Sequence, residues 1–469
     1  MSDMGLSVAA SALEADQLEM STVAGNLANA TTPGYAVEQV DQVDVAPTGG
    51  VAVVGIDQLG SSLLDSALRT AQAAQSSTEV TQQALSSVEG LFPEPSGNGL
   101  SSQLSQLWSD LSSVAASPGN TAAQGVVIQD AATVASTLNS TYDGLAQTSS
   151  GLVTQVGSGT GSGELAQANT YLADVASLNG RIVAGTAAGS DVNALVDTRR
   201  EDLSKLSQLI GATARAEPGG AVTVFALGVA LVQGTNSGML LATGSPPDPP
   251  PAPGAPPGSQ LGVSTSSGVV VPVGGSIGAA LTAVNSTLPG MQSELSAVAN
   301  ALAGSLNALQ AAGMDAAGVP GSSLPAIFVN AGSTAFVAST SSAGSIAVDP
   351  ALTAGQIATA SASAGPAGTA TLDGSNAALM AALASAPSGP DALYGDLVGS
   401  VGSAAAAANQ AASTAQTLAD QASSAASAVS GVDTNAQSID MLQAQQSFEA
   451  AAKLTGTISS SIQSLLAAV

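Results

Sequence analysis

The side chains that most often carry out enzymatic chemistry are missing from this sequence. It contains no His and no Cys, which removes the commonest general base near neutral pH, thiolate nucleophiles and the usual zinc ligands. A carboxylate pair or a Ser–Lys pair could still act, but no spacing of these residues nominates either one. We interpret Asp197, Arg199 and Arg200 as a helix surface with local ion pairs. We therefore predict no catalytic, cofactor-binding or metal site, and no enzyme.

The charge balance argues against two classes of partner. Seven Lys and Arg stand against 33 Asp and Glu, which gives a formal net charge of −26. Such a surface cannot hold a phosphate backbone and is not attracted to anionic lipid. No apolar run is long enough to cross a bilayer. We expect neither nucleic-acid binding nor membrane insertion.

Both ends of the chain carry the pattern of an amphipathic helix. At the N-terminus Leu6, Leu13, Met20 and Leu27 hold one heptad position. At the C-terminus a second apolar face includes Met441, Phe448, Ile462 and Leu466. The pattern alone fits two explanations equally well: two surface helices on one core, or two ends that pair with each other and with neighbouring subunits.

The rest of the chain reads as long helices around a β-rich middle. Gly and Pro stops predict helices over 60–91, 98–116, 120–156, 164–184 and 192–210. Alternation then predicts strands within 221–233, 238–243 and 268–273. Helices return over 275–312, 376–384 and 393–430, the last with Leu397, Val401, Leu418 and Val429 on its apolar side. The Pro-rich segment 245–258 is expected to be an exposed, extended loop.

A helix end runs into a fixed turn between Val23 and Tyr35, with the sequence VAGNLANATTPGY. Asn26 and Asn29 can cap backbone groups, and Pro33 prevents the helix from continuing. Gly34 allows a left-handed turn, and Tyr35 anchors the chain after it.

As a pattern, this segment resembles the N-terminal signature of the flagellar axial proteins, the family of rod, hook and hook-associated subunits. The matching residues are Asn26, Ala28, Asn29, Thr32, Gly34 and Tyr35. The C-terminus is similar to the family's second signature, a turn at Gly431, Val432 and Asp433 followed by a helix that contains Met441, Gln445, Phe448 and Lys453. In the middle, 190–234 resembles the hook-associated branch at the hook–filament junction, through residues such as Asn193, Asp197, Arg199, Leu231 and Gly234.

The resemblance implies a fold that is mainly α with a β-rich outer domain, in an elongated, hairpin-shaped molecule whose N- and C-terminal helices pair at the base. It implies three parts. Residues 1–45 and 431–469 would form a terminal helical assembly domain, and 46–215, 275–315 and 373–430 a helical core domain. Residues 216–274 and 316–372 would form the β-rich outer region, which carries the Pro-rich loop 245–258.

The resemblance also implies a function, that of a structural subunit at the junction between hook and filament. Copies would leave the cell through the flagellar type III channel without a cleaved signal peptide and would self-associate extracellularly into a ring or tube. The implied partners are the hook protein, a second hook-associated protein next to the filament, and an export chaperone. Leu6, Leu13, Met20, Leu27, Met441, Phe448, Ile462 and Leu466 would form the assembly interface.

Two alternatives remain open on the sequence. A rod or hook protein of the same family would share the terminal signatures but would lack the long helices of 120–156 and 192–210. A secreted adhesin or surface-layer protein would fit the Ser, Thr, Gly and Ala composition but would not need the N-terminal turn.

Overall fold

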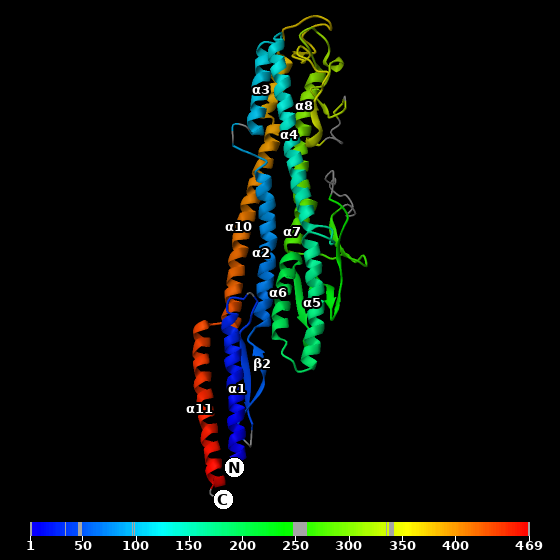
Figure 1. Ribbon diagram of the computed structural model, residues 1–469. Helices are drawn as coiled ribbons and strands as arrows, with labels where there is room; N and C mark the ends of the chain where they lie inside the picture. The colour runs from blue at the N-terminus through cyan, green and yellow to red at the C-terminus, as the bar shows by residue number, and fades with distance from the viewer. Residues whose placement is uncertain are drawn as a thin grey trace.

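The protein is elongated, and its two chain ends lie together at one extremity (Figure 1). The structure is a computed structural model, which describes residues 2–32, 34–45, 49–95, 97, 99–246, 260–333, 335–336 and 342–467, without the side chains of residues 2–4, 465 and 466. The described chain is mainly helical with short sheets, which confirms the predicted fold class.

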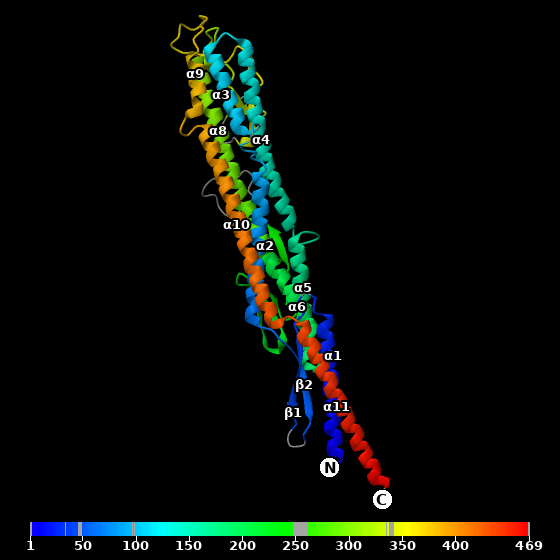
Figure 2. The ribbon, with the colours of Figure 1, turned by 90° about the vertical axis from the view of Figure 1, so that its left-hand side faces the viewer.

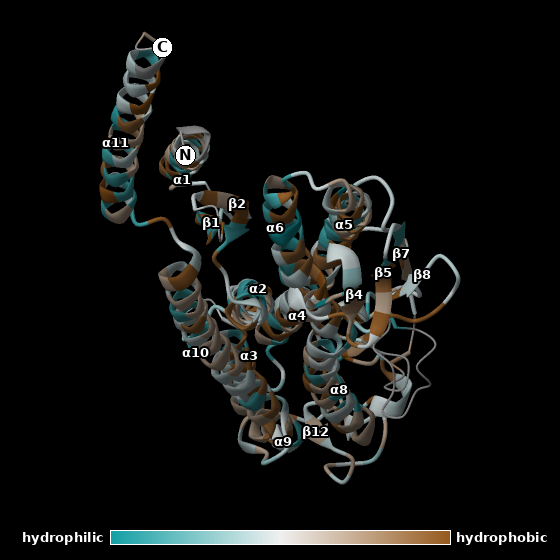
Figure 3. Cartoon of the chain, turned by 90° about the horizontal axis from the view of Figure 1, so that it is seen from below, coloured by the Kyte–Doolittle hydropathy of each residue, from teal (hydrophilic) through white to brown (hydrophobic). Residues whose placement is uncertain are grey.

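The terminal part consists of two long helices and a β-hairpin. The helices are α1 (Ser2–Ala28) and α11 (Thr434–Ala467), and the hairpin strands are β1 (Glu38–Asp44) and β2 (Val51–Gln58). Helix α1 packs against α11 on one side and against both hairpin strands on the other. Seen from the base, the order is α11, α1, hairpin and then helix α6 (Asn193–Ile210) of the body (Figure 3). The two hairpin strands lie on either side of residue 45 and pair with each other, so the hairpin joins the segments before and after that predicted boundary.

The body of the molecule is a bundle of long helices that run along its axis (Figures 1 and 2). They are α2 (Ser62–Glu89), α3 (Leu100–Ala116), α4 (Thr121–Val156), α5 (Glu164–Ala187), α6 (Asn193–Ile210), α7 (Gly275–Thr282), α8 (Leu288–Ala312), α9 (Ser375–Ala381) and α10 (Pro390–Ser430). Each lies where the Gly and Pro stops predict a helix. A π-helical turn, Ala283–Thr287, joins α7 to α8 just before Pro289, whose ring nitrogen cannot donate a hydrogen bond.

Helix α10 packs along α2 through a seam of small side chains. Its buried residues recur at steps of three and four: Tyr394, Leu397, Val401, Ala405, Ala408, Ala412, Ala415 and Ala419. Alanine at these positions lets two long helices approach closely. Leu418 and Val429 are 54% and 44% exposed, so the predicted apolar face of this helix is correct only in its first half.

The strands form small antiparallel sheets beside the helices. The largest contains β3 (Ala212–Ala216), β4 (Val222–Ala226), β5 (Val229–Gln233) and β6 (Asn236–Ser237) in that order. Strand β7 (Leu240–Thr243) pairs with β8 (Gly262–Thr265), β9 (Gly313–Met314) with β12 (Ala360–Ser361), and β10 (Phe328–Asn330) with β11 (Ile346–Val348). The turn at Leu227 and Gly228 has positive φ at both residues, the geometry of a tight two-residue hairpin.

Two predictions about the β-rich region need correction. Residues 268–273 form no strand; Val270 makes only an isolated bridge to Ser264, and β8 lies earlier in the chain. The strands also do not form one outer region, because β5, β6 and β7 pack on α5 whereas β10 and β11 pack on α8 and α4 respectively. Most of the Pro-rich loop 245–258 lies outside the described residues.

Candidate assembly interface at the paired termini

The face of α11 that meets α1 is a regular stripe of half-buried side chains. It comprises Met441, Phe448, Ala451, Thr455, Ile458 and Ile462, with the buried Ala444 among them. The spacing of three and four residues is that of a two-helix seam. On α1 the buried side chains are mostly small, such as Ala9 and Ala15. A Cβ on Gly5 would lie 3.2 Å from Cδ1 of Ile458, so the helices are close at this point.

Asn26 is the buried polar centre of this part of the molecule. Its Nδ2 donates to the carbonyl oxygen of Glu38 and to Oε1 of Gln437, each at 2.8 Å. Its Oδ1 accepts from the hydroxyl of Tyr35 at 2.8 Å and from the backbone N–H of Glu38 at 2.9 Å. The side chain is fully buried and uses both donors and both acceptor positions of an amide. One residue thus ties α1, the start of β1 and α11 together.

The turn after α1 is held by its own polar side chains. Nδ2 of Asn29 donates to the carbonyl of Gly25 at 3.1 Å, and the hydroxyl of Thr32 donates to Oδ1 of Asn29 at 3.2 Å. Gly34 has a φ of +80°, a conformation that only glycine adopts at little cost. Pro33 lies outside the described residues. The turn brings the hydroxyl of Tyr35 into hydrogen-bonding distance of the Asn26 side chain.

The second signature forms the link between α10 and α11. The backbone N–H of Val37 donates to the carbonyl of Ser430 at 2.8 Å, which joins the end of α10 to the start of the hairpin. A Cβ on Gly431 would lie 2.4 Å from the carbonyl oxygen of Ser427, so a side chain does not fit there. Oδ1 of Asp433 accepts from the N–H groups of Asn435 and Ala436 at 2.9 and 3.2 Å, which caps α11. Val432, between Gly431 and Asp433, is half-buried.

Electrostatics keep Tyr35 in its donor form. Burial, together with the nearby carboxylates of Glu38, Asp197 and Asp191, raises the pKa of the Tyr35 hydroxyl to about 12. Burial also raises the pKa of Asp197, although Arg200 at 2.6 Å opposes the shift. Arg200 donates to the carbonyl of Gly34 at 3.2 Å and thereby connects the turn to α6 of the body.

Comparison with known proteins places this geometry in a family. The model of the family described as flagellar hook-associated protein FlgK helical domain matches residues 85–324, just over half of the chain. The chain belongs to the FlgK family of flagellar hook-associated proteins. The model of the flagella basal body rod protein family matches residues 6–35, which are α1 and the turn after it.

Individual FlgK relatives have low sequence identity to this chain, but they carry the same name. Flagellar hook-associated protein 1 of Escherichia coli (strain K12) is 25% identical over 364 residues, which cover 74% of this chain and 63% of that protein. The Bacillus subtilis (strain 168) protein of the same name is 28% identical over 222 residues, 44% of this chain and 43% of that protein. The chain thus spans less than two thirds of the length of these curated relatives. The solved structure of the flagellar hook junction protein FlgK from Burkholderia pseudomallei has the same fold, with a TM-score of 0.62 and 17% identity over 77% of this chain and 100% of that one.

The interface residues predicted from the sequence of this FlgK-family chain differ in their burial and in their position relative to the seam between α1 and α11. Met441, Phe448 and Ile462 lie in the seam with α1. Leu6, Leu13 and Met20 are half-buried, and Leu27 is 44% exposed. The fully buried residues of α1 lie beside this frame, at Ala9, Asp16 and Val23, and the role of the predicted residues in assembly stays a prediction. The side chain of Leu466 lies outside the described residues.

Sequence reasoning missed two of the most exposed apolar side chains of the terminal helices, Ile439 and Leu442, and assigned a third, Leu454, to a wider apolar face of the C-terminal helix. These side chains are 56%, 57% and 48% exposed on α11, respectively. Ile439 and Leu442 lie off the heptad frame that predicted the seam, and a search for a second apolar stripe on the same helix could have found them. They give the terminal pair an apolar face with no partner in the described molecule.

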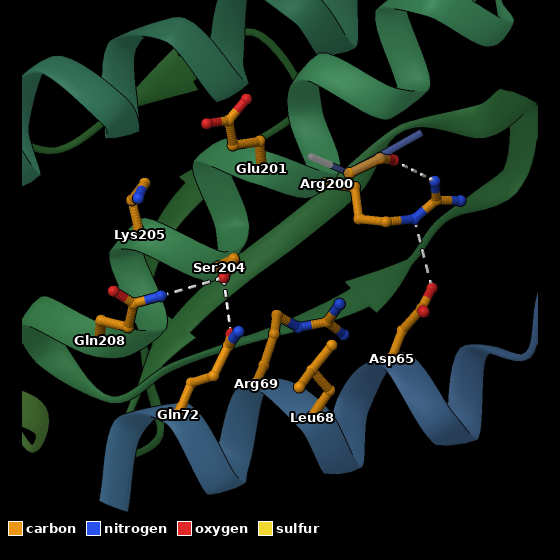
Figure 4. Close-up of a pocket in the computed structure, with 10 residues that line it drawn as sticks. Asp65, Leu68, Arg69, Gln72, Arg200, Glu201, Ser204, Lys205 and Gln208 are labelled. Carbon is orange, nitrogen blue, oxygen red and sulfur yellow. Dashed lines mark hydrogen bonds and ion pairs between the residues drawn. The ribbon is translucent and has the colours of Figure 1, made fainter. Parts of the chain in front are cut away.

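Three further observations on the described residues concern metal ligands, membrane spans and cavities. Its Asp and Glu residues nowhere gather in a group of three that could hold a metal ion. None of its described helices is long and apolar enough to cross a membrane. A cavity of about 230 Å³ lies between α2 and α6 and is lined mainly by polar and charged side chains (Figure 4).

Proposed function

We propose that this chain is a structural subunit of the junction between the flagellar hook and filament. Copies leave the cell through the flagellar type III channel, without a cleaved signal peptide, and self-associate into a ring or tube at the distal end of the hook. The terminal helices face the inside of that assembly, and the body lies outward. The hook protein lies on one side of the ring and a second hook-associated protein on the other, and an export chaperone holds the subunit before export.

The observation that carries this proposal is the closed pairing of the two chain ends around Asn26, in a chain whose body matches the hook-associated helical domain. The pair leaves Leu27, Ile439, Leu442 and Leu454 exposed. Exposed apolar side chains grouped on one element are typical of a surface that another subunit covers. Repeated contact between identical copies, each using the same two different surfaces, builds a ring or tube.

The alternatives left open by the sequence are less well supported. The rod-protein family accounts for residues 6–35 only, whereas the hook-associated family accounts for α3 to α8. The alternative of a surface-layer protein or adhesin gives no reason for the two termini to pair. The relatives are structural proteins of the flagellum by name, which favours a role without catalysis.

The proposal is tested in the source bacterium by deleting the gene and restoring it with an epitope-tagged copy. We expect the deletion strain to carry hooks without filaments and to release unpolymerised flagellin into the medium. In the restored strain, gold-labelled antibody should mark the distal end of each hook. Normal filaments in the deletion strain, or label along the filament or at the rod, would contradict the proposed junction role.

A further inference from the structure

The few cations of this acidic protein are not spread over its surface. Five of the seven Lys and Arg residues lie on or beside α2, α6 and β3. They are Arg69, Arg199, Arg200, Lys205 and Arg215. Because Asp and Glu outnumber them so strongly elsewhere, this concentration marks one face of the body as different from the rest.

Four of these cations line one groove. It has a volume of about 550 Å³ and lies between the start of α2, the middle of α6 and strand β3. Strand β3 is the first strand of its described sheet, and its residues Ala214, Arg215 and Ala216 line the groove. Leu63, at the mouth of the groove, is 76% exposed. The groove therefore offers positive charge together with an uncovered apolar side chain.

Part of this positive charge is compensated within the molecule. Arg200 contacts Asp65 at 3.4 Å and Asp197 at 2.6 Å. Figure 4 shows Asp65 and Arg69 rising from α2 toward Arg200 on the facing helix. Arg215 pairs with Glu217 at 2.9 Å and lies over the ring of Phe225, 5.5 Å from its centre.

The remaining two guanidinium groups make no ion pair within 4.0 Å among the described residues, although the carboxylate of Asp65 also attracts Arg69. Arg199 is 8% exposed and donates to Oδ1 of Asn179 and to the carbonyl of Gly220 at 3.0 and 2.7 Å. Arg69 is half-buried, and no ion pair of its guanidinium falls within 4.0 Å in the described chain. Burial lowers the pKa of both groups, but arginine remains charged at any physiological pH. The groove thus keeps an excess of positive charge that an acidic segment can neutralise.

The outward face of the β1–β2 hairpin has the complementary chemistry. The register pairs Gln39 with Asp57 and Asp41 with Gly55, so these residues share one face. Asp41 and Asp57 are exposed. Val43, on the same face, is 47% exposed, and Val54, the extra residue of the bulge in the hairpin, is 63% exposed. The opposite face of the hairpin packs on α1, and the side chains of Asp41, Asp57, Val43 and Val54 stay exposed to solvent in the described part of the molecule.

We propose that the outward face of the hairpin of one copy docks into the arginine groove of a neighbouring copy. Asp41 and Asp57 would approach Arg69 and Arg215, and the exposed valines would cover Leu63. The inference rests on the proposed self-assembly and adds a specific contact to it. It also accounts for the clustering of cations in a chain that has so few. The acidic surface elsewhere on the body would repel the acidic face of the hairpin.

Cross-linking tests the contact directly, because the chain has no cysteine of its own. Val43→Cys and Leu63→Cys are placed in two differently tagged copies, which are co-expressed in the source bacterium lacking its own gene. Oxidation of isolated flagella should give a covalent dimer that carries both tags. Copies with Val43→Cys paired with Leu379→Cys, at the far end of the body and 56% exposed, serve as the matched control and should give none.

The outcomes separate this contact from the proposed function. Both tags present at the hook tip without a mixed covalent dimer would overturn the contact and leave the junction role standing. Absence of both tags from the hook tip would overturn the junction role and the contact with it.

Charge exchange provides a second, independent test. Arg69→Glu with Arg215→Glu, or Asp41→Arg with Asp57→Arg, should each lower the yield of the mixed dimer about tenfold, because opposite charges become like charges. The chain that carries all four changes should regain the yield, since attraction is restored with reversed signs. Arg181→Glu, an exposed arginine outside the groove, should leave the yield unchanged. Loss of the dimer in the four-change chain, with thermal unfolding intact, would contradict the proposed contact.

Discussion

Asn26 shows how one side chain can join segments that are distant in sequence. Its hydrogen bonds reach Tyr35, Glu38 and Gln437, the last of them 411 residues away. A fully buried amide with all of its hydrogen-bonding positions used is costly to replace, because each partner left unpaired loses its hydration without compensation. Asn26 therefore contributes to the stability of the terminal pair beside the seam between α1 and α11.

Asn26→Asp is expected to loosen α11 without affecting the body. The carboxylate cannot donate, so the carbonyl of Glu38 and Oε1 of Gln437 would face an acceptor, at a cost of about 2 kcal/mol or more. Hydrogen exchange of the free protein should show faster exchange in α11, while the main thermal transition of the body stays in place.

Asn29→Asp is the matched control for this change. Asn29 contacts only Gly25 and Thr32 at the end of its own helix, so exchange in α11 should not change. Equal effects of the two substitutions would mean that Asn26 does not hold the terminal pair.

The signature residues could be recognised from the sequence, but the role of Asn26 could not. A helix end followed by Pro33 and Gly34 predicts a turn, and capping is the usual role of Asn in that place. The capping interpretation is correct for Asn29. Asn26 also bonds backbone groups, the N–H and C=O of Glu38, but these lie on β1, and its further partner Gln437 lies on α11. No local pattern identifies such distant partners.

Helix boundaries were the most predictable feature at the scale of elements. Gly90, Pro118 and Gly157 end helices where the sequence predicts, because each is incompatible with helical continuation or favours a cap. The β1–β2 hairpin was missed because its strands do not alternate strictly; β1 reads EQVDQVD, and β2 contains a bulge.

Helices α3 and α4 carry a pair of acidic groups that makes stability depend on pH. Burial and the neighbouring carboxyl of Asp110 raise the pKa of Asp130 to about 6. The folded state therefore holds a proton that the unfolded chain has already lost above its ordinary value near 4. Stability should fall as pH rises from about 4 to 6 and then level off.

Asp130→Asn should remove this loss. The variant is expected to be more stable than the native chain at pH 7, by less than about 1 kcal/mol because the pair is partly screened by solvent. The difference should vanish near pH 4, where the native carboxyl is also neutral. Thermal unfolding at both pH values measures this, with the exposed Asp420→Asn on α10 as the control. A stability gain that is the same at both values would rule out titration of Asp130 as the cause.

The whole molecule divides into a body with its own core and a terminal pair that lies outside that core. The buried cluster that runs through α2 to α10 contains no residue of α1 or α11. The elongated shape and the pairing of the ends followed from the family signatures and the heptad patterns. The placement of the strands did not follow, because short β segments gain their positions from packing on helices that are distant in sequence.

A fragment of residues 60–430 should therefore fold alone. We expect it to be soluble and monomeric, with a cooperative thermal transition close to that of the full chain, since its core is complete. It should be unable to restore filaments in the deletion strain. Non-cooperative unfolding of this fragment would show that the terminal helices are part of the folding core.

The most direct test of the account is the effect of charge on the uncovered face of α11. Ile439→Asp with Leu442→Asp changes side chains that are already exposed in the free molecule, so export and the fold of the monomer should be unaffected. In the assembly the same face would be buried, and an unpaired carboxylate there is strongly unfavourable. We predict hooks without filaments, with the variant protein in the medium, whereas Leu379→Asp at the far end of the body should allow normal filaments. Normal filaments in the Ile439→Asp, Leu442→Asp strain would contradict the claim that the paired termini form the assembly interface.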